Sequence, residues 1–234
     1  MGKIVAIGGG ELRLGETKNI DQYIVTLSDK QNPKLLFLPT ASMDSQGYVE
    51  RVKKEFEPMG CTVQALCLTR EEYTQEQIKQ LVLGADIIYV GGGNTAFMMD
   101  CWRQHKVDEY LRQAYKRGAV LSGLSAGSIC WFVSGYSDSD LIENNGEGSY
   151  RFVDGLGILP YLHCPHYDEE GREGFDTMAE EKAAQGQRLP AIALENQTAL
   201  VNIDGVCRIL KENQSKKAYL FTYENGAYRR KEIF

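Results

Sequence analysis

The sequence predicts an α/β fold, a mostly parallel sheet with helices on both faces and antiparallel C-terminal strands. Three observations predict it. Short apolar runs that suit strands alternate with helical patterns along the first half of the chain. These strand runs are continuously apolar rather than alternating with polar residues, which is typical of parallel strands buried on both faces. The last third of the chain changes to paired strand patterns around tight-turn dipeptides.

The elements follow in a regular order. Continuous apolar runs predict five strands, at 3–10, 34–42, 62–68, 86–94 and 119–125. Amphipathic spacing predicts the intervening helices, at 19–28, 45–60, 74–84 and, in two pieces, 94–118. Thr74 and Gln77 form a capping-box pattern at the start of the third helix.

The tail reads as two hairpins with turns at Asp204-Gly205 and Asn225-Gly226. We expect both to add antiparallel strands to one sheet. No linker, repeat or low-complexity segment interrupts the 234 residues, so residues 1–234 are predicted to form a single domain.

Composition narrows the function classes. The net charge of −6, without a basic cluster, argues against nucleic acid as a partner. No apolar stretch approaches the roughly 18 residues of a membrane helix. The six cysteines include no CxxC pair, and no signal-peptide pattern opens the chain, so we expect a reduced, cytoplasmic protein. No cofactor is expected, and monomer and homodimer both stay open.

Gly123-Leu124-Ser125-Ala126-Gly127 matches the G-x-S-x-G pattern between a predicted strand and a predicted helix. In this context the small flanking residues permit a tight turn that projects the serine at a helix N-terminus, where free N–H groups stabilise an oxyanion. The alternative interpretation is a turn that needs small residues only for packing. We favour a nucleophilic Ser125.

A serine nucleophile needs a base. His163 and His166, which follow an apolar run, suit this role better than His105 in a charged helix. A zinc site at the two neighbouring histidines is disfavoured because no third ligand is evident. The acid that orients the base has two candidate places: Glu195 in an apolar strand run, and the Asp138 and Asp140 pair after the serine helix. The residues themselves do not choose between them.

Four segments, VGGGNTAFMM, GLSAGS, GLGILP with HCPHYD, and IALENQTALV, occur in an order that resembles the peptidase E family of serine peptidases, which also includes cyanophycinase. The resemblance covers residues 3 to about 210. It implies a class I glutamine-amidotransferase-like α/β sandwich and a small-peptide substrate, and in peptidase E itself a dipeptide that begins with aspartate.

The resemblance assigns roles to particular residues. It implies Ser125 as nucleophile, His166 as base, Glu195 as third triad member and Asp140 as a further essential acid. It also implies an oxyanion hole and a substrate-holding side chain, which are assigned to the backbone N–H groups of Gly93 and Ala126 and to Asn94. For aspartate recognition peptidase E places a cation downstream of the histidine, and here that stretch offers Arg172 early.

Two other functions remain as alternatives. A non-peptidase esterase would use the same machinery, with Asp140 in the acid position of an α/β-hydrolase order. A ligand- or nucleotide-binding relative is suggested by Gly8-Gly9-Gly10 after the first strand, although this run is neither a dinucleotide nor a Walker A motif. The serine, the histidine and the glycine-rich strand ends favour a serine-type hydrolase, and the resemblance implies a dipeptidase-like peptidase.

Overall fold

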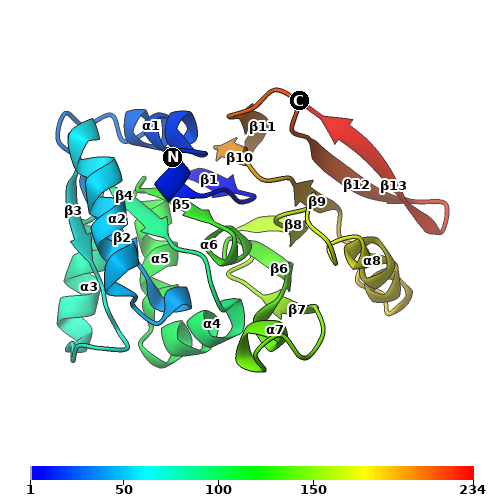
Figure 1. Ribbon diagram of the computed structural model, residues 1–234, viewed down its shortest axis with the longest axis horizontal. Helices are drawn as coiled ribbons and strands as arrows, with labels where there is room; N and C mark the ends of the chain where they lie inside the picture. The colour runs from blue at the N-terminus through cyan, green and yellow to red at the C-terminus, as the bar shows by residue number, and fades with distance from the viewer. Residues whose placement is uncertain (1) are drawn as a thin grey trace.

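The computed structural model describes residues 2–234 and contains two mixed sheets (Figure 1). Five parallel strands form the centre and one edge of the larger sheet, and β10 and β11 extend it antiparallel to β1. In spatial order the strands are β11 (Val206–Lys211), β10 (Thr198–Ile203), β1 (Lys3–Ile7), β5 (Val120–Leu124), β4 (Ile87–Val90), β2 (Lys34–Leu38) and β3 (Thr62–Ala65).

Helices cover both faces of this sheet. One face carries α1 (Lys18–Thr26) and α2 (Gln46–Phe56), and the other carries α3 (Gln75–Gly84), α4 (Thr95–Gln104) and α5 (Val107–Lys116). Successive residues of β1 alternate between the two layers: Val5 and Ile7 pack with α1 and α2, while Ile4 and Ala6 pack with α4 and α5. Both faces are therefore dry, which explains the continuous apolar strand pattern.

The smaller sheet lies beside the first. Its strands, in spatial order, are β13 (Ala227–Ile233), β12 (Ala218–Glu224), β9 (Ala191–Leu194), β8 (Leu159–Cys164), β6 (Phe132–Ser137) and β7 (Arg151–Asp154). Helix α8 (Gly174–Ala184) packs on it through Phe175. The short elements are α6 (Ala126–Ile129), α7 (Ser139–Glu143) and three 3-10 turns, η1 (Leu12–Leu14), η2 (Thr40–Ser42) and η3 (Glu57–Met59).

The fold class predicted from sequence is confirmed. The capping box at Thr74 forms, and the predicted long helix divides at Lys106, which has a positive φ of 55°. The prediction of a single sheet is wrong. The first tail hairpin, β10 and β11, joins the larger sheet at β1, whereas the second, β12 and β13, joins the smaller sheet at β9. The chain crosses from the smaller to the larger sheet after β9 and returns to the smaller sheet after β11.

The fold brings three glycine-rich strand ends together. Strands β1, β5 and β4 are parallel neighbours, so their carboxyl ends lie at the same edge of the sheet. These ends lead into the runs that begin at Gly8, Ser125 and Gly91. In parallel α/β sheets this edge is where ligands bind. Among the helices of residues 2–234, none is long and apolar enough to span a membrane.

Candidate active site

Ser125 stands at the sharp turn between β5 and α6. Its backbone has φ 59° and ψ −116°, outside the regions that an ordinary side chain prefers. Strain of this kind costs about 1–3 kcal/mol and persists only where the surroundings enforce it. The backbone N–H of Ser125 donates to the Ile7 carbonyl at 3.1 Å, which ties the turn to β1. The serine is thereby held at the sheet edge.

The flanking glycines are required by packing. A Cβ on Gly123 would lie 2.3 Å from the Gly127 carbonyl oxygen, and a Cβ on Gly127 would lie 2.2 Å from the Val90 carbonyl oxygen. Neither backbone oxygen can move away cheaply, because each belongs to a neighbouring element of the core. The small residues of the motif therefore let α6 pack directly against β4 and β5.

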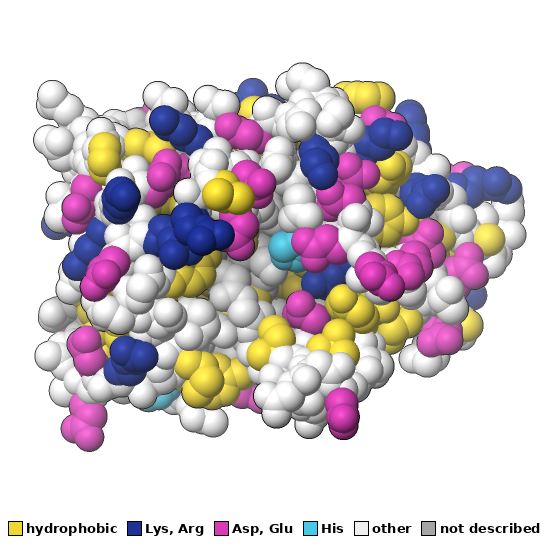
Figure 2. Space-filling model, viewed as in Figure 1, with side chains coloured by type: hydrophobic (Ala, Val, Ile, Leu, Met, Phe, Trp, Pro, Cys, Tyr) yellow, Lys and Arg dark blue, Asp and Glu magenta, His cyan; other side chains and the backbone are white. Residues whose placement is uncertain are grey.

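A hollow of about 430 Å³, which we call the Ser125 hollow, opens at this turn. Figure 2 shows a histidine at the rim of a depression in this face, with acidic and basic side chains on either side. The structure brings Ser125 and His166 together in the lining of this hollow. The full lining is Gly10, Glu11, Leu12, Ser45, Gly47, Tyr48, Arg51, Gly92, Leu124, Ser125 and His166.

His166 is held by the glycines at the end of β1. It adopts a positive φ of 53°, and its N–H donates to the Gly8 carbonyl at 3.0 Å. A Cβ on Gly9 would come within 2.4 Å of the His166 ring, so glycine at position 9 permits the close approach. The run Gly8-Gly9-Gly10 therefore positions His166 beside the Ser125 hollow.

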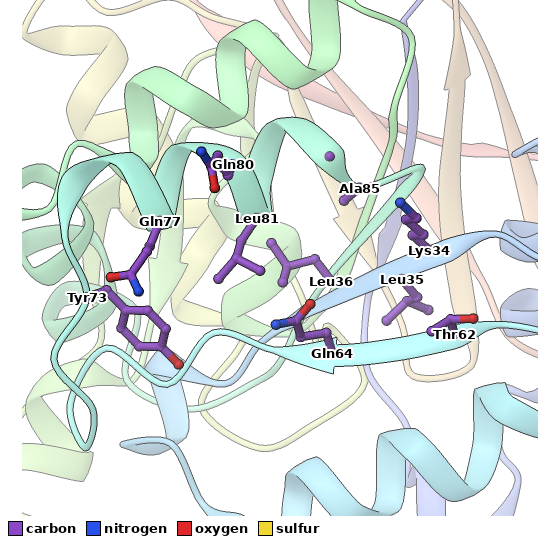
Figure 3. Close-up of a pocket in the computed structure, with 11 residues that line it drawn as sticks. Lys34, Leu35, Leu36, Thr62, Gln64, Tyr73, Gln77, Gln80, Leu81 and Ala85 are labelled. Atoms are coloured by element: carbon purple, nitrogen blue, oxygen red, sulfur yellow. The ribbon is translucent and has the colours of Figure 1, made fainter.

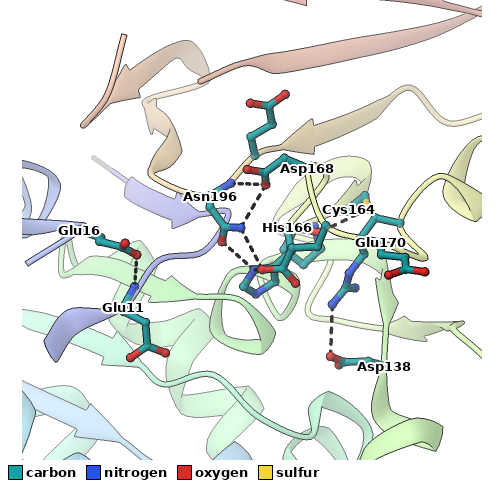
Figure 4. A network of polar contacts seen from close by, with 12 residues as sticks. Glu11, Glu16, Asp138, Cys164, His166, Asp168, Glu170 and Asn196 are labelled. Carbon is teal, nitrogen blue, oxygen red and sulfur yellow. Dashed lines mark hydrogen bonds and ion pairs between the residues drawn. The ribbon is translucent and has the colours of Figure 1, made fainter. Parts of the chain in front are cut away.

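The Nδ1 atom of His166 faces two acceptors (Figure 4). The Asn196 side-chain oxygen lies at 2.8 Å and a Glu169 carboxylate oxygen at 3.0 Å. The Asn196 amide donates its own hydrogens to Asp168 at 3.1 Å and to Glu169 at 2.9 Å, which directs its oxygen to the ring. Nδ1 therefore carries the proton, and in the neutral ring Nε2 is the free base.

The Glu169 carboxylate is well suited to stay charged. The hydrogen bond from His166 lowers the pKa of Glu169 to about 2, and the Asn196 hydrogen bond acts in the same direction. Lys216 pairs with the neighbouring Asp168 at 2.5 Å. An anion beside Nδ1 would stabilise the imidazolium that forms when His166 accepts a proton.

Two backbone N–H groups beside the serine are free. Those of Gly93 and Ala126 have no hydrogen-bond partner within residues 2–234. By contrast, the Gly92 N–H donates to the Tyr48 hydroxyl at 3.3 Å. The family resemblance assigned the oxyanion hole to the backbone N–H groups of Gly93 and Ala126. That both groups are free is compatible with this role.

The Asn94 side chain makes structural contacts. It caps α4 by accepting from the Phe97 N–H at 3.0 Å, and its amide donates to Glu143 at 2.9 Å. Asn94 is 7% exposed. A contact between the Asn94 side chain and substrate would therefore have to break or share its hydrogen bonds with Phe97 and Glu143.

The structure does not place the expected acids on the His166 ring. Glu195 accepts from the Lys217 N–H at 2.9 Å, and Asp140 pairs with Arg151. Asp138 pairs at 3.2 Å with Arg172. No hydrogen bond joins any of these three carboxylates to His166 in the described part of the chain. Glu195 nevertheless immediately precedes Asn196, which does contact the ring.

His163 belongs to the support of the turn. Its Nδ1 donates to the Ile192 carbonyl at 2.9 Å, and its Nε2 lies 2.9 Å from the Ser128 hydroxyl, which also donates to the Ser125 carbonyl at 2.7 Å. The ring stacks on Phe132, with 4.1 Å between centroids. Burial lowers the pKa of His163 to about 3, which keeps the ring neutral. Ser128 lies one turn after Ser125 in α6, so this second histidine stabilises the helix that follows the serine.

Another hollow, of about 490 Å³, lies between α3, strand β2 and the edge strand β3 (Figure 3). Its lining includes Gln64, Gln77, Leu81 and Tyr73, and among residues 2–234 no serine, histidine or carboxylate lines it. The groups needed for acyl transfer therefore concentrate at the Ser125 hollow.

Sequence reasoning missed Glu169 and Asn196. Glu169 lies three residues after His166, in the acidic stretch that follows HCPHY, and Asn196 follows Glu195. The only sequence signal for Glu169 was this i, i+3 spacing in a loop, where spacing does not predict side-chain contact. For Tyr48 and Arg51 the sequence pattern predicts only that they lie in the amphipathic helix at 45–60.

Comparison with known proteins agrees with this architecture. Residues 4–210 match the family model described as Peptidase family S51. An uncharacterized peptidase, YgaJ of Bacillus subtilis, is 39% identical over 171 residues, which cover 73% of this chain and 70% of the relative. Peptidase E of Shewanella denitrificans is 27% identical over 221 residues, covering 89% and 87%.

Two solved structures have the same fold. A peptidase from an acI-B1 Actinobacterium superposes with a TM-score of 0.69 at 18% identity, covering all of this chain and 95% of the other. A putative peptidase E protein from Listeria monocytogenes gives a TM-score of 0.63 at 18% identity over 90% and 98%. The expected α/β sandwich fold is thus confirmed.

Proposed function

Since the chain belongs to peptidase family S51 and is a serine-type peptidase, we propose that Ser125 is the nucleophile with which it hydrolyses short peptides. The observation that carries the proposal is the strained Ser125 turn sharing one hollow with His166, whose Nδ1 is held by Asn196 and Glu169. The turn is then a nucleophile elbow.

The proposed reaction has two halves. Ser125 Oγ attacks the peptide carbonyl as Nε2 of His166 takes its proton, and the N–H groups of Gly93 and Ala126 hold the negative charge on the carbonyl oxygen. His166 then gives the proton to the leaving amine, and an acyl-enzyme remains. Water, activated by the same nitrogen, releases the acid and restores Ser125.

The third member of the triad is proposed separately. Glu169 and Asn196 support the imidazole in the structure, whereas the family resemblance proposes Glu195 and Asp140. Glu169→Gln, Glu195→Gln and Asp140→Asn test these assignments side by side. The acid that stabilises the imidazolium should lower kcat by roughly 100-fold or more when made neutral, because its charge and orientation both act on His166.

The experiment that tests the function is hydrolysis of a dipeptide panel by wild type and Ser125→Ala. The panel includes N-terminal Asp, Glu, Arg and Leu, since relatives include a probable alpha-aspartyl dipeptidase of Drosophila melanogaster. Cleavage that disappears in Ser125→Ala supports the proposal. Full activity in Ser125→Ala would refute it. Cleavage of a simple nitrophenyl ester without any peptide would favour the esterase alternative.

A further inference from the structure

Arg51 stands in the wall of the Ser125 hollow. It is the one arginine or lysine among the residues, all within 2–234, that line this hollow. It comes from α2, whose first turns also contribute Gly47 and Tyr48 to the same wall. Its charge is close enough to favour ionisation of the Tyr48 hydroxyl, although burial dominates and raises the pKa of Tyr48 to about 12.

The Arg51 guanidinium is available to a ligand. Within residues 2–234 its side chain makes no hydrogen bond and no ion pair. Arg172, which the sequence offered as the substrate-reading cation, is in a different situation. Its side chain is 3% exposed, pairs with Asp138 at 3.2 Å and donates to the Tyr136 carbonyl at 3.1 Å. Both terminal nitrogens of Arg172 are therefore engaged inside the protein.

The neighbouring hollow is more acidic than the Ser125 hollow. It measures about 270 Å³, shares Gly10, Glu11 and His166 with the Ser125 hollow, and is also lined by Glu16 and Glu169. Lys216, the one lysine or arginine that residues 2–234 contribute to its lining, is paired with Asp168. A carboxylate would be repelled from that side and attracted to Arg51, while an ammonium group would have the reverse preference.

We propose that Arg51 binds a carboxylate of the substrate peptide. A guanidinium presents two parallel N–H donors to a carboxylate, so it supplies orientation as well as charge. This inference rests on the proposed function, since it concerns the same hollow. In a dipeptide the group is either the C-terminal carboxylate, one residue from the scissile bond, or the side chain of an acidic residue.

The test compares wild type, Arg51→Gln and the control Lys54→Gln, which removes the same charge one turn further along α2, outside this hollow. One arm pairs a cleaved dipeptide with its C-terminal amide. The other arm pairs Asp with Asn, and Glu with Gln, at the N-terminal position. Arg51→Gln should lower kcat/KM for the carboxylate form by roughly 10–100-fold, the range of a charge-assisted contact, and change the matched neutral form little.

The two arms identify which carboxylate is bound. Loss of the acid-over-amide preference in the C-terminal pair assigns Arg51 to the terminal carboxylate, and loss in the side-chain pairs assigns it to an acidic residue. Equal effects on charged and neutral members, or an Arg51→Gln enzyme indistinguishable from Lys54→Gln, would overturn the proposal.

A binding measurement separates this proposal from the proposed function. Calorimetric titration of Ser125→Ala with a dipeptide and its amide needs no turnover. If wild type hydrolyses no peptide but Ser125→Ala prefers the free carboxylate and loses that preference with Arg51→Gln, the carboxylate site stands and the peptidase function does not. If neither hydrolysis nor binding distinguishes the two forms, the carboxylate site is refuted.

Discussion

Asp21→Asn should stabilise the protein at neutral and alkaline pH. Asp21 lies in α1 with a fully buried side chain. One carboxylate oxygen accepts from the Thr17 hydroxyl at 2.7 Å, and the other has no hydrogen-bond partner within residues 2–234. Burial raises the pKa of Asp21 from 3.8 to about 8. The folded protein therefore keeps this acid protonated at pH 7.

The sign and size follow from proton linkage. Above pH 3.8 the unfolded chain releases this proton while the folded chain retains it, so the folded state loses stability as pH rises from about 4 to about 8. Each pH unit above 3.8 lowers the free energy of unfolding by about 1.4 kcal/mol, so the loss reaches about 4 kcal/mol at pH 7. Asparagine avoids this cost and keeps an acceptor for Thr17, but buries an additional N–H at about 1–2 kcal/mol. We expect a net gain of about 2 kcal/mol.

The assay is denaturant and thermal unfolding of wild type, Asp21→Asn and Asp154→Asn at pH 4, 6, 7 and 8. Asp154 is exposed, so its variant controls for the change in net charge. The gain from Asp21→Asn should be absent at pH 4, grow with pH, and at pH 7 raise the Tm by roughly 4–8 °C. A gain that does not change with pH, or an Asp21→Asn protein less stable than wild type at pH 8, would refute the reasoning.

Three further predictions concern the active site and its support. Gly127→Ala should destabilise the fold by about 1–3 kcal/mol and reduce activity, measured by thermal unfolding and hydrolysis, while Gly84→Ala, which has open space, should do neither. Tyr48→Phe removes the hydroxyl that accepts from Gly92 and should lower kcat roughly 10-fold with little change in KM. An unchanged kcat would exclude a catalytic role for this hydrogen bond to the loop that begins at Gly91. Because the folded-state pKa of His163 is depressed to about 3, stability should fall with pH below 6.5, and His163→Gln should show a shallower slope in acid denaturation.

The sequence predicted what depends on local pattern. Continuous apolar runs identified the parallel strands, because burial of both faces demands apolar residues at every position. The G-x-S-x-G motif predicted the strand–turn–helix around Ser125, because the close packing at Gly123 and Gly127 allows only glycine at these two positions. The cytoplasmic location and the single domain over residues 1–234 stay predictions.

The tertiary structure decided what depends on segments distant in sequence. The loop after His166 meets the turn after β9, so Glu169 and Asn196 reach Nδ1, whereas the sequence left the acid open between Glu195 and the Asp138 and Asp140 pair. Arg51 enters the Ser125 hollow because α2 packs beside the end of β4, a contact that helical spacing alone does not reveal. Periodicity predicts which face of an element is buried, whereas the side chains that meet across a sheet edge depend on strand order and crossover geometry, which only the folded chain provides.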